Sequence, residues 1–445
     1  MDDSLIIVRQ SALQESVQKH EDVYQAAVAQ GTTRAATDGS GLDEFQKARF
    51  MAAWNNGMGA LNASGSDAPI MTTAQNGTAS RIQSALVEFA ARNNSLKVVR
   101  PGREVVSGNT AIQLAQLLEV KFDNFDWLGW MGMAYLLVFK PQKARWVAPL
   151  EPTKIANNAT VAVFGDWGTG MYGAPYIASQ VEKMDRCDLV LHLGDTYYAG
   201  RDNEISRRLT SDWPKRPGVL NRTLNGNHEM YSGGSAYLAA LSNAAYPFDQ
   251  ESSCFALQND NWLLLGLDSA YVDTDLDDAQ VAWLNSMVKG EVGKNRKVIL
   301  FSHHQLYSKY DNIPHNLQEK LGPLLNEGLI YGWLFGHEHR MVIFEPHSQW
   351  GVRARCIGNG GFPEFRKTPG RDDDPLTWLS LPKDPTTQVP AAQALDGANK
   401  YVKADGGDPG LYVPHAFMRL DFIGDKVFET YIDPDGNVIR AKAEL

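Results

Sequence analysis

The sequence has few of the features that mark secreted or nucleic-acid-binding chains. Its 445 residues include three cysteines and no CxxC pair, so neither a disulfide framework nor a zinc knuckle is indicated and buried, reduced thiols are expected. Acidic side chains outnumber basic ones, 52 against 42, which gives a formal net charge of −10. Nucleic-acid grooves depend on clustered lysine and arginine, so scaffold binding to nucleic acid is not expected. A small phosphate substrate stays open, because a bound metal can supply local positive charge.

Long hydrophobic runs are also scarce. The uncharged stretch at residues 127–139, WLGWMGMAYLLVF, is much shorter than the about 20 residues that a helix needs to span a bilayer. We interpret it as a buried helix, with contact to a membrane or a protein partner as the alternative. The N-terminal residues lack a basic segment followed by an apolar core, so no secretory signal is recognised and a cytoplasmic location is expected.

The pattern of apolar residues changes near residue 155. Residues 1–155 show helical spacing, for example at Ile82, Leu86 and Phe89, and predict a mostly helical N-terminal region of unknown role. Residues 156–445 instead show short apolar runs that end in glycine-containing turns and alternate with helical patterns, which predicts an α/β catalytic domain. A stretch rich in proline, glycine and aspartate at about 362–410 is expected to be a long loop insertion. Residues 412–422 and 426–432 predict a closing hairpin.

Side chains of the metal-ligand type follow the expected strands. The strands are predicted at residues 160–164, 188–193, 219–224, 297–302 and 329–335. In α/β folds the loops at the carboxyl ends of strands gather at one edge and carry function. The sequence therefore predicts that the residues just beyond these ends lie together: Asp166, Asp195, Asn227, His228, His303, His337 and His339.

The residue types in this group suit a two-metal site. Two carboxylates, one amide and the imidazoles of His303, His337 and His339 offer mixed oxygen and nitrogen donors, which favour iron, manganese or zinc. His337 and His339 alternate with Glu338, so on an extended segment they point the same way. A single aspartate can bridge two cations with its two oxygens. The neighbouring His304 has the same ligand type as His303, so type alone does not choose between them.

Five motifs resemble those of the calcineurin-like metallophosphoesterases, and most of all the purple acid phosphatase branch. They are GDWG at 165–168, GDTYY at 194–198, GNHE at 226–229, FSHHQ at 301–305 and GHEH at 336–339. The resemblance covers about residues 160–361 and the final hairpin. It implies a metallophosphoesterase β-sandwich of two mixed sheets flanked by helices.

The resemblance also implies a role for each motif residue. Two metal ions, Fe(III) and a divalent iron, manganese or zinc ion, are expected as cofactors. Gly168 stands where many relatives have a ligand histidine, and Tyr198 is the replacement expected in the purple branch. The implied ligands are Asp166, Tyr198 and His339 for the first metal, Asp195 as the bridge, and Asn227, His303 and His337 for the second metal.

The implied function is that of a metal-dependent phosphoric ester hydrolase of the acid phosphatase or phosphodiesterase type. A metal-bound hydroxide would attack a small monoester or diester, His228 would protonate the leaving oxygen, and Glu229 would orient His228. One alternative is a manganese or zinc phosphodiesterase acting on nucleotides or phospholipid head groups. Another is a non-catalytic partner- or membrane-binding protein on the same scaffold.

Overall fold

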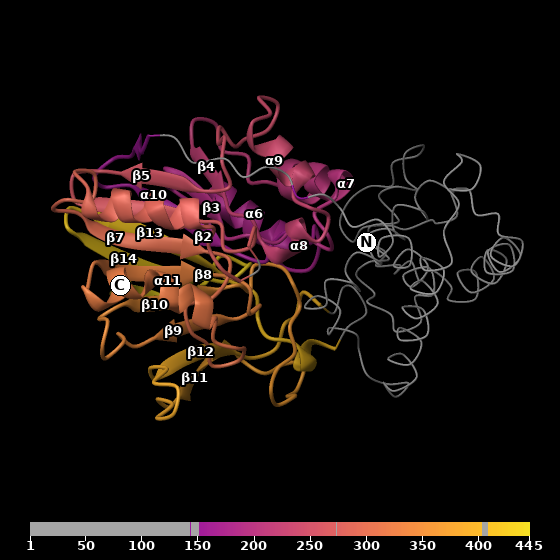
Figure 1. Ribbon diagram of the computed structural model, residues 1–445. Coiled ribbons are helices and arrows are strands. Elements are labelled where there is room, and N and C mark those ends of the chain that lie inside the picture. Colours follow the sequence, from indigo (N-terminus) through magenta and orange to yellow (C-terminus); the bar gives the residue numbers. More distant parts are fainter. Residues whose placement is uncertain (1–142, 144–150, 273, 403–407) are drawn as a thin grey trace, which may run out of the picture. The chain divides into compact units, whose positions relative to one another are not determined.

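The computed structural model describes residues 143, 151–272, 274–402 and 408–445. These residues form two mixed β-sheets with helices beside them (Figure 1), so the predicted α/β sandwich of two mixed sheets is confirmed. The helices predicted before residue 143 and the stretch at 127–139 lie outside the described residues, and the N-terminal region therefore stays a prediction. Within the part described, no helix is long and apolar enough to cross a membrane.

The six-stranded sheet combines a parallel half and an antiparallel half. β2, β3 and β4 run parallel, and the predicted closing hairpin is present as β13 and β14, with β13 pairing antiparallel to β2. The strand order is β15 (Val438–Glu444), β14 (Lys426–Ile432), β13 (Phe417–Ile423), β2 (Thr160–Phe164), β3 (Leu189–His192) and β4 (Leu220–Thr223).

The nine-stranded sheet holds a parallel centre formed by β6, β7, β8 and β10. Its strand order is β1 (Thr153–Lys154), β5 (Phe255–Gln258), β6 (Trp262–Leu267), β7 (Lys297–Ser302), β8 (Ile330–Phe335), β10 (Arg353–Ile357), β9 (Met341–Phe344), β12 (Ala392–Asp396) and β11 (Thr377–Leu381).

Two strands, β11 and β12, lie within the segment that was predicted as a long loop insertion at about 362–410. These two strands extend the nine-stranded sheet at its edge, where β12 pairs with β9 and β11 pairs with β12. β11 is mostly exposed, so it lacks the buried apolar run by which central strands are recognised. Pro382 directly follows β11, and Pro375 stands shortly before it. Because proline is uncommon in strands, these residues favoured the prediction of a loop.

Apolar side chains form layers between the sheets and under the helices. β7 shows how one strand serves two layers: Ile299 and Phe301 pack between the sheets, whereas Val298 and Leu300 pack under helices. The helix α10 (Asp278–Lys289) begins after the N-cap Asp277, whose side chain accepts the N–H of Ala279 at 2.8 Å.

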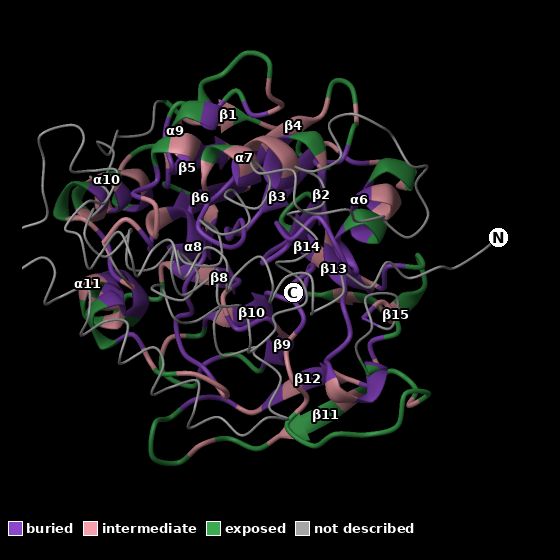
Figure 2. Ribbon diagram, turned by 90° about the vertical axis from the view of Figure 1, so that its right-hand side faces the viewer, coloured by how far each residue is buried: buried purple, intermediate pink, exposed green. Residues whose placement is uncertain are grey.

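The other helices cover the outer faces of the two sheets (Figure 2). α11 (His315–Asn326) buries four leucines at helical spacing beside α10, and α6 (Ala174–Lys183) and α9 (Ser235–Leu241) cover the six-stranded sheet. The three cysteines are buried and form no disulfide, as expected. This packing fixes the strand ends from which the predicted ligands project.

Candidate metal centre

The structure brings the residues predicted as ligands, except Tyr198, together at the strand ends. Asp166 follows β2, Asp195 follows β3, His303 follows β7, and His337 and His339 follow β8. Asn227 opens the short helix α8 (Asn227–Met230) after β4. Among the described residues, ligand atoms of Asp166, Asp195 and His303 lie within 4.8 Å of one another, and so do those of His303, His304 and His337. Because His303 belongs to both groups, the two groups are contiguous.

Four of these residues have an unusual backbone conformation. The φ angle is 53° at Asp166, 74° at Asp195, 69° at His337 and 51° at His339. Residues other than glycine are uncommon at positive φ and cost about 1–3 kcal/mol each there. Such strain persists where the surrounding structure imposes it, typically at functional sites. The backbone therefore marks these positions independently of their side-chain types.

One half of the centre, here called the Asn227 half, consists of Asn227, His303, His337 and Asp195. The Asn227 Oδ1 lies 2.9 Å from His303 Nε2 and 3.1 Å from His337 Nδ1. The two imidazole nitrogens are 3.2 Å apart, and Asp195 Oδ2 is 3.4 Å from His303 Nε2. Four ligand atoms thus converge on one small volume.

The outward-facing contacts of the Asn227 half set the orientation of its amide and the tautomers of its two imidazoles. His303 Nδ1 donates to the carbonyl oxygen of Leu193 at 2.9 Å, and His337 Nε2 lies 3.4 Å from the Asp311 carboxylate. Asn227 Nδ2 donates to the Tyr231 hydroxyl at 2.6 Å, which fixes the orientation of its amide. With their hydrogens turned outward, His303, His337 and Asn227 present lone pairs to the inside.

The Asn227 half therefore needs a cation. The inward-facing Oδ2 of Asp195 is buried without a hydrogen-bond partner in the described structure. Burial, followed by the carboxylates of Asp166 and Glu229, raises the pKa of Asp195 well above its usual range. A cation here would provide the missing partner and offset the repulsion between the carboxylates. Burial, followed by the neighbouring His304 and His337, lowers the pKa of His303 well below its usual range, so this imidazole does not supply the missing positive charge. Converging oxygen and nitrogen lone pairs fit an iron, manganese or zinc ion.

The other half, here called the His339 half, consists of Asp166, Tyr197 and His339. The Tyr197 hydroxyl donates to Asp166 Oδ1 at 3.0 Å and lies 3.0 Å from His339 Nε2. Burial disfavours the imidazolium, but hydrogen bonds to Asp166 and Glu364 outweigh burial and raise the pKa of His339 to about 9. Burial, followed by the carboxylates of Asp166 and Asp195, raises the pKa of Tyr197 well above 10. This half holds protons of its own.

The tyrosine found in the His339 half differs from the predicted one. The structure brings the hydroxyl of Tyr197 to Asp166 and His339, whereas the sequence prediction gave this place to Tyr198. Tyr198 is buried, its N–H donates to Glu204 Oε1 at 2.6 Å, and its carbonyl accepts from His228. The residue type could not separate two adjacent tyrosines, because the turn after β3 decides which side chain points to the ligands.

His228 lies where an acid for the leaving group is needed. Its Nδ1 donates to the Tyr198 carbonyl oxygen at 2.5 Å, and its Nε2 faces Asp195 Oδ2 at 3.7 Å. The ring packs against Tyr197 and Tyr231, with centroid distances of 4.4 and 4.9 Å. The backbone carbonyl of Tyr198 therefore orients this imidazole and turns Nε2 toward the ligand cluster.

The contacts of Glu229 differ from the orienting role predicted for it. Its Oε2 accepts the N–H of Gly226 at 2.9 Å, and burial raises its pKa to about 7. Gly226 has no room for a side chain, because a Cβ there would lie 2.1 Å from Asp195 Oδ1. Glu229 thus stabilises the tight turn that carries Asn227 and His228, while the Tyr198 carbonyl holds the imidazole.

Sequence reasoning missed two carboxylates that hold the ligand histidines from outside. Glu364 Oε2 lies 3.3 Å from His339 Nδ1, and Asp311 Oδ2 lies 3.4 Å from His337 Nε2. Carboxylates behind a metal-binding histidine fix its tautomer and raise its basicity. Both residues come from loops without a motif, and only their position after β10 and β7 could have suggested them.

The remaining histidines near the centre have separate partners. His304 Nδ1 lies 3.0 Å from the Ser269 hydroxyl, and burial lowers its pKa well below the usual range. His304 therefore has its own anchor, with its ring 4.6 Å from that of His337. His192 is a core residue: its ring lies among Phe164, Trp167 and Trp213.

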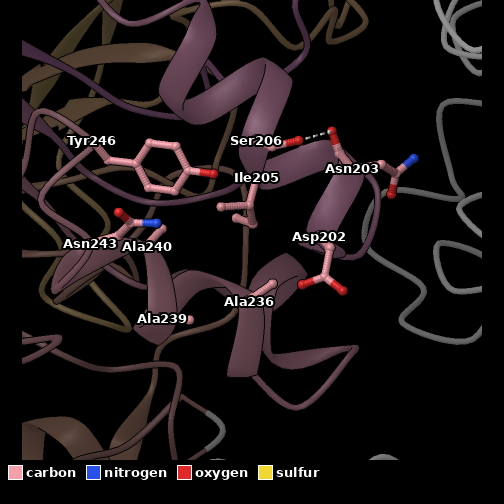
Figure 3. A pocket seen from close by; sticks show the side chains of 9 residues that line it. All are labelled: Asp202, Asn203, Ile205, Ser206, Ala236, Ala239, Ala240, Asn243 and Tyr246. Carbon is pink, nitrogen blue, oxygen red and sulfur yellow. Dashed lines mark hydrogen bonds between the residues drawn. The ribbon is translucent and has the colours of Figure 1, made fainter.

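A cavity of about 360 Å³ lies elsewhere, between α7 (Asp202–Glu204), the π-helix at Ile205–Ser211 and α9 (Figure 3). Asp202, Tyr246 and three alanines are among the residues that line it. None of its lining residues is a candidate ligand, so this cavity is separate from the candidate metal centre.

The fold is an α/β sandwich of the metallophosphoesterase type, with the ligand cluster at its strand ends. Residues 159–341 match the model of the calcineurin-like phosphoesterase family. The matched range contains every predicted metal ligand. Members of the family are generally phosphoester hydrolases.

Solved structures give more distant likenesses. The chain is similar to purple acid phosphatase PPD1 from yellow lupin (Lupinus luteus) seeds, at 16% identity and a TM-score of 0.46, over 67% of this chain and 55% of that one. It is also similar to GAP50 of Plasmodium, at 14% identity and a TM-score of 0.45, over 65% and 88%. It is similar to a dimetal phosphatase from Danio rerio as well, at 13% identity and a TM-score of 0.39, over 64% of this chain and 98% of that one. The chain thus spans little more than half of the lupin protein. No curated protein matches the sequence.

Proposed function

We propose that the chain hydrolyses phosphate monoesters or diesters at a two-metal centre of the purple acid phosphatase kind. The observation that supports this most is the convergence of four acceptor atoms in the Asn227 half, with all their hydrogens turned outward. This arrangement is favourable only around a cation. The His339 half adds the carboxylate, phenol and imidazole for a second cation beside it.

Asn227, His303 and His337 would hold one metal ion, Asp166, Tyr197 and His339 the other, and Asp195 both. When bound, two such ions activate water and neutralise charge on the phosphoryl group. A phenol oxygen among the donors favours Fe(III) in the His339 half, with a divalent iron, manganese or zinc ion as its partner. We retain Tyr198 as the alternative donor, because the sequence motif favours it.

The side chain of His228 would complete the chemistry. Its Nε2 faces the cluster while Nδ1 is held by the Tyr198 carbonyl, so in the protonated form the Nε2–H is available to the departing oxygen. Its burial keeps bulk water from competing for that proton. Tyr231 supports both His228, through ring contact, and Asn227, through its hydroxyl, and so couples the acid to the ligands.

The proposal is tested by hydrolysis assays on the full chain with a panel of phosphate monoesters and diesters. We expect activity after loading with iron together with zinc or manganese, its loss on chelation, and its return on adding the metals back. Preference for diesters with manganese or zinc alone would favour the phosphodiesterase alternative. Metal binding without hydrolysis of any ester would contradict the proposal and favour a binding protein.

A further inference from the structure

Two cations contact one tyrosine ring beside the candidate metal centre. The Arg340 guanidinium lies 4.4 Å from the centroid of the Tyr310 ring, and the Lys367 Nζ lies 4.5 Å from it. Cation–π contacts of this length position a charged group without neutralising it. Tyr310, Arg340 and Lys367 are called the cation rim below.

The cation rim adjoins both halves of the centre through its sequence neighbours. Arg340 directly follows His339, a member of the His339 half. Tyr310 directly precedes Asp311, whose carboxylate lies 3.4 Å from Nε2 of His337 in the Asn227 half. The rim is therefore next to the side chains that would surround a bound phosphoryl group.

The charges around the rim leave one cation without a carboxylate partner. Arg340 lies 3.5 Å from Glu364, and the other oxygen of Glu364 lies 3.3 Å from His339. Asp311 is engaged with His337. Lys367 is exposed and, among the described residues, has the Tyr310 ring as its contact and forms no ion pair.

The segment that carries Lys367 is firmly attached to the fold. The neighbouring Arg366 pairs with Asp396 at 2.8 Å and with Asp374 at 3.0 Å, and its N–H donates to the Leu411 carbonyl at 2.8 Å. Two adjacent basic residues thus have different surroundings: Arg366 anchors the segment, whereas Lys367 presents an uncompensated charge. In a chain with a net charge of −10, an unpaired cation next to a phosphate site calls for an anionic ligand.

We propose that Lys367, supported by Tyr310 and Arg340, binds a second anionic group of the substrate. The preferred substrates would then be phosphate esters that carry another phosphate or carboxylate group in addition to the one that is hydrolysed. This inference rests on the proposed function, and it adds a substrate class to it. The scissile phosphate would occupy the metal centre, and the second anion would lie over the rim.

The experiment compares p-nitrophenyl phosphate, which has one anionic group, with a nucleoside 3′,5′-bisphosphate, which has two phosphate esters, using the metal-loaded full chain. In Lys367→Gln we expect kcat/KM to fall about three- to fivefold for the bisphosphate, chiefly through KM, and to stay unchanged for p-nitrophenyl phosphate. Lys367→Arg should restore most of the loss. Lys294→Gln is the matched control, since this exposed lysine precedes β7 at the strand end opposite to His303.

A binding measurement separates this inference from the proposed function. Calorimetry on the metal-loaded protein should show weaker binding of pyrophosphate, but unchanged binding of orthophosphate, in Lys367→Gln. That result without any hydrolysis would overturn the proposed function and leave the inference standing. Equal effects on both anions, or none on either, would overturn the inference even if the protein is an active phosphatase.

Discussion

The two halves of the candidate metal centre differ in where their protons lie. In the Asn227 half the hydrogens of His303, His337 and Asn227 are turned outward and the inside holds lone pairs. In the His339 half a phenol proton lies on Tyr197 and points to Asp166, and the pKa of His339 is raised to about 9. The imidazoles and the amide of the first half present lone pairs to the inside, whereas the imidazole and the phenol of the second half carry protons there.

This difference determines which protons each half releases when a metal ion binds. A cation entering the Asn227 half replaces no proton on Asn227, His303 or His337, because their hydrogens point outward. The raised pKa of Asp195 concerns the carboxylate that both halves share. A cation entering the His339 half has to displace protons from His339 and Tyr197, since ligands bind metals in their deprotonated forms. We therefore expect the Asn227 half to load first and the His339 half to load second.

The largest effect on hydrolysis should come from replacing His228, which faces the ligand cluster but is not itself a ligand. His228→Asn removes the acid that faces the cluster, so hydrolysis should fall by roughly 10²–10⁴-fold. The metal content should stay at the wild-type value, because neither half loses a donor. Initial rates and elemental analysis on the same sample check this, and unchanged hydrolysis would show that His228 does not act as the acid.

Replacing the carboxylates behind the ligand histidines should weaken metal binding in one half at a time. Asp311→Asn should weaken metal binding in the Asn227 half, and Glu364→Gln should weaken it in the His339 half, each by about 10–100-fold. Competition titrations with a chelator measure the two affinities. Glu327→Gln is the control, because this carboxylate pairs with Lys289 on the surface. If both variants weaken the same metal, the division into halves fails.

The identity of the tyrosine donor is a finer test of the His339 half. In iron-loaded protein, Tyr197→Phe should abolish the visible phenolate-to-iron absorption band, and Tyr198→Phe should retain it. Absorption spectra of the two variants at matched iron content decide the question. Loss of the band in Tyr198→Phe alone would return the assignment to the sequence motif.

His192 offers a comparison outside both halves. It is a buried imidazole whose Nε2 has no partner in the described structure, and burial lowers its pKa to about 3. Between pH 3 and 6.5 the unfolded chain binds a proton there that the folded protein does not, so stability falls as the pH drops through this window. In His192→Gln, the loss of unfolding free energy between pH 6.5 and 4 should be smaller by roughly 1–3 kcal/mol. Denaturant unfolding curves at several pH values check this, and an unchanged pH dependence would contradict it.

Much of the fold could be predicted, because buried strands leave a strong pattern. β2, β6, β7 and β14 begin and end where the apolar runs begin and end. The exposed edge strand β11 was missed for the opposite reason, since exposure and flanking prolines hide the pattern. Its neighbour β12 is mostly buried but was missed with it. The pattern of apolar residues therefore predicts a strand only where the side chains of that strand are buried.

The candidate site shows the same limit at the level of single residues. Asp166, Asp195, His303 and His339 could be placed because each follows a strand end. Which tyrosine reaches the ligands, Tyr197 or Tyr198, depends on the backbone path of the turn after β3. Two adjacent residues of the same type carry no information about that path. The partners of the ligands, such as Glu364, come from distant loops, and only the tertiary structure brings them near.

The central claim is that this centre holds two metal ions in two distinct halves. The most direct measurement is the number of metal ions per chain in the wild type, in His303→Ala and in His339→Ala after loading and desalting. We expect about two ions in the wild type and about one in each variant, with the remaining ion in the intact half. A wild-type chain that binds no metal, or variants that keep both ions, would contradict the account.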